Sequence, residues 1–383
     1  MNYTIEHRTL HFKQPAGTSR GVYHTRDVWY IHLYEGDWHG IGECAPLPDL
    51  SCDAYPNEEY EQYLHAACRM TCQLGHIPYE WLRDYPSILF GLEMVEKKRL
   101  SPRPPYREGA SYTQGGTVRE GVSSRNAAPS LHFSSSDKSR GRGESLPAFG
   151  PLCRINGLIW MGTYDEMRRQ LEAKLEAGYH CIKLKIGAIN FEDELALIKQ
   201  VRRDFGSEVV ELRVDANGGF GNNYGEAIDK LHRLAEYDLH SIEQPIRQKH
   251  WQEMAALCAD SPLPIGLDEE LIGINTTAKK IALLDTIRPQ YIILKPMLHG
   301  GFSGCDEWIR LAEERGIGWW ATSALESNVG LAAIARWVAQ YHPTMPQGLG
   351  TGLLYTDNTP PETEIRGDEL WFRQILHPLK GGD

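Results

Sequence analysis

The sequence lacks any long hydrophobic run and any excess of basic residues. No stretch approaches the ~18 consecutive apolar residues of a transmembrane helix, and the polar start MNYTIEHRTLHF has no signal-peptide core. We therefore expect a soluble, cytoplasmic protein without a membrane partner. The formal net charge of -11 opposes nucleic-acid binding, because phosphate backbones attract basic surfaces.

Paired cysteine motifs are also absent. The eight cysteines are scattered without a CxxC pair, and the sequence contains no HExxH motif. We therefore expect free, mostly buried thiols, and neither disulfides nor a zinc site.

The first part of the chain changes character near residue 99. Alternating apolar and polar residues over 22–43 predict a β-hairpin that turns at Gly36 and Asp37, and helical patterns follow over 57–74 and 87–98. We take 1–98 as one α+β domain. The next segment, 99–146, is rich in Ser, Gly, Pro and Arg, with eight basic and four acidic residues. It cannot bury enough apolar surface to offset its ordering entropy, so we predict a disordered, low-complexity insertion.

A repeating pattern begins at residue 147. Short apolar runs alternate with amphipathic helical segments up to residue 353, and the count of eight strands and seven helices predicts a (β/α)7β TIM-type barrel. The tail, 354–383, shows no further amphipathic helix. We expect it to return to the N-terminal α+β piece.

Ionisable residues lie late in six successive predicted strands, at intervals of 25 to 31 residues. These residues are Lys185, Asp215, Glu243, Asp268, Lys295 and Glu326. Each interval is one βα unit, so all six side chains should reach the C-terminal rim, where such barrels carry their active sites. The three adjacent acids would repel one another unless a cation neutralised them. An all-oxygen site suits Mg²⁺, with Mn²⁺ as a substitute.

Each acid also has a structural explanation. Asp215 precedes Asn217 and Gly218, which favour a tight turn. A calcium loop from Asp215 to Glu226 is disfavoured, because Phe220 stands where that loop needs glycine. Glu243 could cap a neighbouring element, and Asp268 could be the N-cap of a short turn.

Lys183 and Lys185 project from the same face of one predicted strand. A second ammonium group, a metal ion and partial burial each lower the pKa of a lysine, so this pair could include a neutral base. The alternative is a static salt-bridge network with the acids. A metal flanked by lysines suits removal of a proton α to a carboxylate, with Lys295 arriving from another strand.

The motifs taken together resemble the enolase superfamily, in the group with muconate-cycloisomerase-like active sites. They are KLK at 183–185, VDANG at 214–218, EQP at 243–245, LDE at 267–269, KPMLHGG at 295–301 and SALESNVG at 323–330. The resemblance implies a barrel with a capping domain built from the N-terminal piece and the tail. It also implies Mg²⁺ held by Asp215, Glu243 and Asp268.

Further motifs resemble, within this group, the dehydratases of menaquinone biosynthesis. They are TRD at 25–27, GIGECAPLPDLS at 40–51, NGLIWMG at 156–162 and GLGTGLLYTDN at 348–358. The implied reaction is loss of water from 2-succinyl-6-hydroxy-2,4-cyclohexadiene-1-carboxylate. Lys185 would abstract the α proton and then protonate the departing hydroxyl, and Lys295 would face the opposite side of the ring. The implied substrate contacts are Lys183, Asn217, Ser323, Glu326 and Gly350, under a loop at 42–51.

Two other functions fit the same residues. Racemases of N-succinylamino acids and dipeptide epimerases resemble this chain equally in using two lysines on opposite sides of the substrate. A non-enzymatic alternative is a protein that binds a partner through its basic insertion.

Overall fold

The computed structural model describes residues 1–18, 21–100, 150–187 and 189–373. The predicted insertion at 99–146 lies outside these ranges apart from its first two residues, and so does the end of the tail. Its disorder therefore stays a prediction, as do the domain boundaries.

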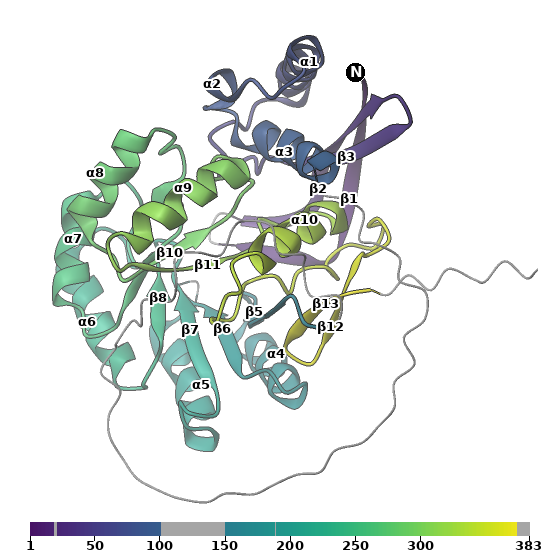
Figure 1. Cartoon of the computed structure of the whole chain (residues 1–383). Coiled ribbons are helices and arrows are strands. Elements are labelled where there is room, and N and C mark those ends of the chain that lie inside the picture. The colour runs from purple at the N-terminus through teal and green to yellow at the C-terminus, as the bar shows by residue number, and fades with distance from the viewer. Residues whose placement is uncertain (19–20, 101–149, 188, 374–383) are drawn as a thin grey trace, which may run out of the picture. The chain divides into compact units, whose positions relative to one another are not determined.

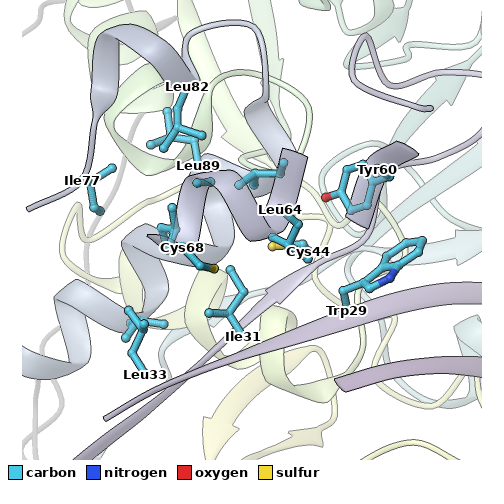
Figure 2. Packing of buried hydrophobic residues seen from close by; sticks show 14 residues of the cluster. Trp29, Ile31, Leu33, Cys44, Tyr60, Leu64, Cys68, Ile77, Leu82 and Leu89 are labelled. Atoms are coloured by element: carbon cyan, nitrogen blue, oxygen red, sulfur yellow. The ribbon is translucent and has the colours of Figure 1, made fainter. Parts of the chain in front are cut away.

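The N-terminal piece is a three-stranded antiparallel sheet packed against helices. Its strands are β1 (Asn2–Thr18), β2 (Gly21–Glu35) and β3 (Trp38–Cys44), and its helices are α1 (Asn57–Leu74), α2 (Tyr79–Leu82) and α3 (Pro86–Leu100). The predicted hairpin is confirmed, and Gly36 supplies the positive φ of 56° in its turn. Figure 2 shows the buried cluster between the sheet and the helices, in which Trp29 and Ile31 of β2 face Tyr60 and Leu64 of α1.

The second piece is a curled parallel sheet surrounded by helices (Figure 1). Its seven strands pair in chain order: β5 (Gly157–Ile159), β6 (Cys181–Lys185), β7 (Glu211–Asp215), β8 (Ser241–Glu243), β9 (Ile265–Leu267), β10 (Tyr291–Leu294) and β11 (Gly318–Ala321). The helices are α4 (Tyr164–Glu176), α5 (Phe191–Asp204), α6 (Tyr224–Ala235), α7 (Trp251–Asp260), α8 (Thr277–Ile287), α9 (Gly301–Glu313) and α10 (Asn328–Ala339), with a 3-10 turn, η1 (Glu269–Leu271). This arrangement fits the predicted TIM-type barrel with a capping sheet.

The eighth strand of the prediction is reduced to two isolated bridges. Gln347 pairs with Ile155, and Gly348 pairs with Thr322 just beyond β11. A Cβ atom on Gly348 would lie 2.2 Å from the Thr322 hydroxyl oxygen, so the chain approaches β11 too closely for a side chain there. These bridges link the two edges of the seven-stranded sheet.

Local signals in the sequence start the barrel helices. A capping box of Thr163 and Glu166 begins α4. The side chains of Asn190, Asn223 and Thr276 accept backbone N–H groups at the starts of α5, α6 and α8. Each such cap satisfies a donor that would otherwise lack a partner at the helix start.

The tail meets both pieces. Its segment at 354–357 contacts β1, with Lys13 N–H donating to the Leu354 carbonyl and Thr356 N–H donating to the His11 carbonyl. Its hairpin, β12 (Thr363–Arg366) and β13 (Glu369–Phe372), instead pairs with β4 (Cys153–Arg154).

All eight cysteines are free, as expected. Among the described residues, no helix is long and apolar enough to span a bilayer.

Candidate active site

Five of the six predicted strand-end residues lie side by side at the carboxyl ends of adjacent strands. Lys185, Asp215 and Glu243 are the last residues of β6, β7 and β8, and register pairs Asp215 with each of the other two. Asp268 and Lys295 directly follow β9 and β10. Parallel pairing therefore brings together groups that the sequence separates by 25 to 30 residues.

Lysine ammonium groups lie among the carboxylates. Lys183 Nζ is 2.9 Å from Asp215 Oδ2 and 2.6 Å from Glu243 Oε2. Lys185 Nζ is 3.1 Å from the same Asp215 oxygen and donates to Asn217 Oδ1 at 2.7 Å, and Lys295 pairs with Asp268. The lysines and acids thus form the interleaved network that the sequence left open as an alternative.

The three acids nevertheless keep features of a cation site. The side chains of Asp215, Glu243 and Asp268 are at most 2% exposed. Within the described residues, one oxygen of Glu243 (Oε1) and one of Asp268 (Oδ1) are buried and have no hydrogen-bond partner. In the described part of the chain, no three Asp, Glu, His or Cys side chains are arranged as a metal-binding group. Asp268 makes no side-chain cap to η1, so capping does not explain its position.

The network shifts the pKa values of its members in opposite directions. Burial would raise the pKa of Asp215, but the charges of Lys183 and Lys185 outweigh it and hold that pKa well below its usual value. Burial and the neighbouring charge of Asp215 raise the pKa of Glu243 well above its usual value. For Lys183, burial alone would lower the pKa, yet Asp215 and Glu243 raise it.

The neighbouring acids act on Lys295 in the same way. The pKa of Lys295 is also raised, because Asp268 and Glu243 outweigh the effect of burial. The neighbouring acids therefore hold Lys183 and Lys295 as ammonium ions, so Lys183 is not the neutral member of the pair with Lys185.

A pocket opens over this network. The predicted site residues that line it are Lys183, Lys185, Asp215, Asn217, Lys295, Ser323 and Gly350. Leu47 and Leu50 of the predicted closing loop line it as well. Glu243 and Asp268 do not line the pocket, and Glu326 is fully buried behind Ser323, accepting hydrogen bonds from the Ser323 hydroxyl and Ala324 N–H.

Sequence reasoning did not assign several residues of the pocket. Glu269 lines it and accepts a hydrogen bond from Asn217 Nδ2 at 2.9 Å. Leu158, Trp160 and Thr351 line its wall. All of these lie in or beside motifs that the sequence showed, but a motif alone does not indicate which side chains face inward.

Comparison with known proteins agrees with this architecture. A family model for the enolase C-terminal domain matches residues 166–369, and a model for the MenC N-terminal domain matches residues 18–99. The o-succinylbenzoate synthase of Desulfotalea psychrophila is 44% identical over an alignment of 387 positions, which covers 97% of this chain and 98% of that protein. This chain belongs to the o-succinylbenzoate synthase family of the enolase superfamily. The family, the hydro-lyase class and the link to menaquinone biosynthesis expected from the sequence are confirmed.

Solved structures of the o-succinylbenzoate synthase family share the fold. The crystal structure of MenC from D. psychrophila has a TM-score of 0.70 and 38% identity, covering 97% of this chain and 99% of that one. The o-succinylbenzoate synthase of Thermosynechococcus elongatus, solved with Mg in its active site, has a TM-score of 0.63 and 22% identity, covering 91% and 92%.

Proposed function

We propose that this chain catalyses the Mg²⁺-dependent dehydration of 2-succinyl-6-hydroxy-2,4-cyclohexadiene-1-carboxylate to o-succinylbenzoate. The main structural support is that Lys185, Lys295 and Asp215 line one pocket at the carboxyl ends of the barrel strands. The identity of 44% to a named o-succinylbenzoate synthase over nearly the whole chain supports the same reaction.

Asp215, Glu243 and Asp268 would hold the metal ion. The partnerless oxygens of Glu243 and Asp268 support this assignment, because a buried carboxylate oxygen without a donor is costly unless a cation satisfies it. Carboxylate oxygens also suit Mg²⁺, and a structural neighbour carries Mg in its active site. When bound, the ion supplies positive charge that stabilises the negative charge developing on the substrate carboxylate.

Lys185 acts as the base and then as the acid. A metal ion held by the three acids would satisfy their charge in place of the lysines, and this leaves the Lys185 amine, which lines the pocket, to act on the substrate. The amine takes the α proton of the substrate, and the electron pair of that C–H bond moves into the carboxylate. The same proton then goes to the 6-hydroxyl group as its C–O bond breaks, so one water leaves and an aromatic ring forms.

Lys295 and the pocket wall position the substrate. Lys295 follows β10, four strands away from β6 in the order of the sheet, and so approaches from another side of the pocket than Lys185. Its ammonium group can stabilise the ring face by electrostatic attraction. Ser323, Gly350 and Asn217 line the wall where the succinyl tail would lie, beneath Leu47 and Leu50.

An absorbance assay of the dehydration tests this function. We expect turnover in MgCl₂ and loss of turnover in EDTA. We expect Lys185→Ala to lose about two to four orders of magnitude in kcat, because a missing general base costs about 10²–10⁴-fold. Turnover that survives either change would contradict the proposal.

Racemisation of N-succinylamino acids is a second candidate, because both lysines line the same pocket. Racemisation needs a proton acceptor on one face and a donor on the other. Lys185→Ala and Lys295→Ala should then abolish it equally, with solvent deuterium entering the α position. A dehydratase needs the amine of Lys185 as its base, so Lys295→Arg should retain more activity than Lys185→Arg.

A cytoplasmic location and the lack of nucleic-acid partners remain inferences from composition. The basic insertion at 99–146 keeps a partner-binding role open as an additional property of the chain.

A further inference from the structure

Two buried glutamates of the N-terminal piece reach across to the barrel helices. Glu43 lies near the end of β3 and is fully buried. Its Oε1 accepts Ser327 N–H at 2.7 Å, and its Oε2 accepts the Ser327 hydroxyl at 2.6 Å and Gly330 N–H at 2.7 Å. One carboxylate thus receives three short hydrogen bonds at the start of α10, where the helix dipole favours a negative charge.

Glu93 makes an equivalent contact one helix earlier. This residue of α3 is 3% exposed and accepts Phe302 N–H, while Ser303 N–H lies 3.2 Å from its Oε1. Gly300 is the N-cap residue of helix α9 and supplies no side-chain cap of its own. The barrel helix therefore takes its cap from α3, a segment that precedes it by about two hundred residues.

Glycines in the barrel motifs make room for these carboxylates. A Cβ atom on Gly330 would lie 2.8 Å from Glu326 Cβ and 2.9 Å from Glu43 Oε2, and one on Gly301 would lie 2.4 Å from Glu93 Oε2. Side chains at these positions would push the glutamates away from the helix starts. The glycines of KPMLHGG and SALESNVG thus serve the contact with the N-terminal piece.

Of the two glutamates, only Glu43 lies next to segments that line the pocket. The chain that follows it carries Leu47 and Leu50, which line the pocket from the N-terminal piece. The chain that precedes Ser327 carries residues 322–325, which line the pocket from the barrel. No residue of α3 and none of 296–303 lines the pocket, so Glu93 fastens the two pieces at a distance from it.

A second buried contact reinforces the same junction. Ala45 N–H points to the Met297 sulfur at 3.3 Å. A guanidinium nitrogen of Arg26 donates to the carbonyls of Ala45 and Ala324. The segment that leaves Glu43 is therefore held to the barrel wall directly above the strand ends.

We propose that Glu43 is a positioning residue of the active site. Its carboxylate holds the start of α10 next to the segment 44–50. It thereby sets the distance of Leu47 and Leu50 from Lys185 and Lys295. Glu93 performs the same docking on α9 without shaping the pocket. The kinetic consequence rests on the proposed function, whereas the structural consequence does not.

Glu43→Gln and Glu93→Gln form a matched pair of variants. In each, the amide retains one acceptor oxygen but turns an NH₂ donor towards backbone N–H donors. We expect Glu43→Gln to speed hydrogen exchange in peptides covering 44–52 and 326–331 by about tenfold, because these segments lose a shared anchor. Glu93→Gln should speed exchange at 301–304 and leave 44–52 unchanged.

Steady-state kinetics on the same pair separates positioning from general stability. We expect KM to rise about fivefold or more in Glu43→Gln with kcat within about threefold, and to stay within about twofold in Glu93→Gln. Ser327→Ala removes one of the three donors and provides a milder form if Glu43→Gln fails to fold. It should change exchange at 44–52 and KM in the same directions.

The positioning role would be overturned if the two glutamine variants changed hydrogen exchange at 44–52 equally. It would also be overturned if neither Glu43→Gln nor Ser327→Ala changed exchange there. If wild-type protein fails to dehydrate the substrate, the proposed function fails. The exchange data still decide the role of Glu43 in that event, because they need no substrate.

Discussion

Replacing Lys183 by methionine would remove the ammonium group that neutralises two buried carboxylates. Lys183 Nζ lies 2.9 Å from Asp215 and 2.6 Å from Glu243, and these acid side chains are only 1% and 2% exposed. Breaking one side of a buried ion pair costs about 3–5 kcal/mol. Because Lys185 still neutralises Asp215, and Glu243 can take up a proton, we expect the lower end of this range, which for a chain of 383 residues is a fall in Tm of roughly 4 °C.

Divalent cations should partly reverse this loss. The variant lacks one positive charge that competes with a metal ion for Asp215 and Glu243. A ligand at 100 times its Kd stabilises the folded chain by about 2.7 kcal/mol. We therefore expect excess MgCl₂ to raise the Tm of Lys183→Met by more than it raises the Tm of wild type.

Calorimetric scans in EDTA and in MgCl₂ measure both effects. Lys174→Met is the matched control. Lys174 lies on the outer helix α4, and its Nζ is 4.7 Å from the Tyr179 ring rather than among acids. Its loss should cost about 1 kcal/mol or less and give no added response to Mg²⁺. The reasoning is refuted if Lys183→Met is as stable as wild type in EDTA, or if Mg²⁺ raises both Tm values equally.

Three further outcomes follow from other parts of the chain. Burial raises the pKa of Asp53 from 3.8 to about 6, although Ser87 N–H and O–H donate to it. The folded chain thus binds this proton more tightly than the unfolded chain. The free energy of unfolding should lose up to about 3 kcal/mol as the pH rises from about 4 to about 6, and urea titrations of Asp53→Asn should lack this slope. Gly42→Ala should destabilise by about 1–3 kcal/mol, because its Cβ would lie 1.9 Å from the Gly91 carbonyl oxygen; thermal melts should show little change for Gly225→Ala, whose Cβ would meet nothing closer than 3.4 Å. Deleting 101–146 should leave kcat/KM within about tenfold of wild type, and a greater loss would assign the insertion a catalytic role.

Periodic features of the sequence predicted most of the fold. Helix α1 spans Asn57–Leu74, the range expected from its helical pattern, and β5 to β11 all lie within 147–353, where alternating strands and helices were predicted. The first strand, Asn2–Thr18, was missed, because its pairing with β2 is interrupted by an irregularity between His11 and Ala16 and its exposed face is polar. The predicted eighth strand reduces to two bridges, since close approach to Thr322 limits it to glycine-rich backbone.

Only part of the candidate site could be predicted from the sequence. The spacing of one βα unit indicates which residues reach the rim, but it does not indicate how their side chains pair. Lys183 was therefore expected beside the acids, yet its position between Asp215 and Glu243 came only from the structure. Contacts such as Glu43 to Ser327 join residues 284 positions apart, and no local pattern encodes them.

A crystal structure with Mn²⁺, located by its anomalous scattering, tests whether Asp215, Glu243 and Asp268 together hold the metal ion. The account predicts one strong peak within about 2.0–2.3 Å of an oxygen from each of Asp215, Glu243 and Asp268, with the ammonium group of Lys183 moved out from between the first two. Mn²⁺ bound elsewhere, with the lysine–carboxylate network unchanged, would contradict it.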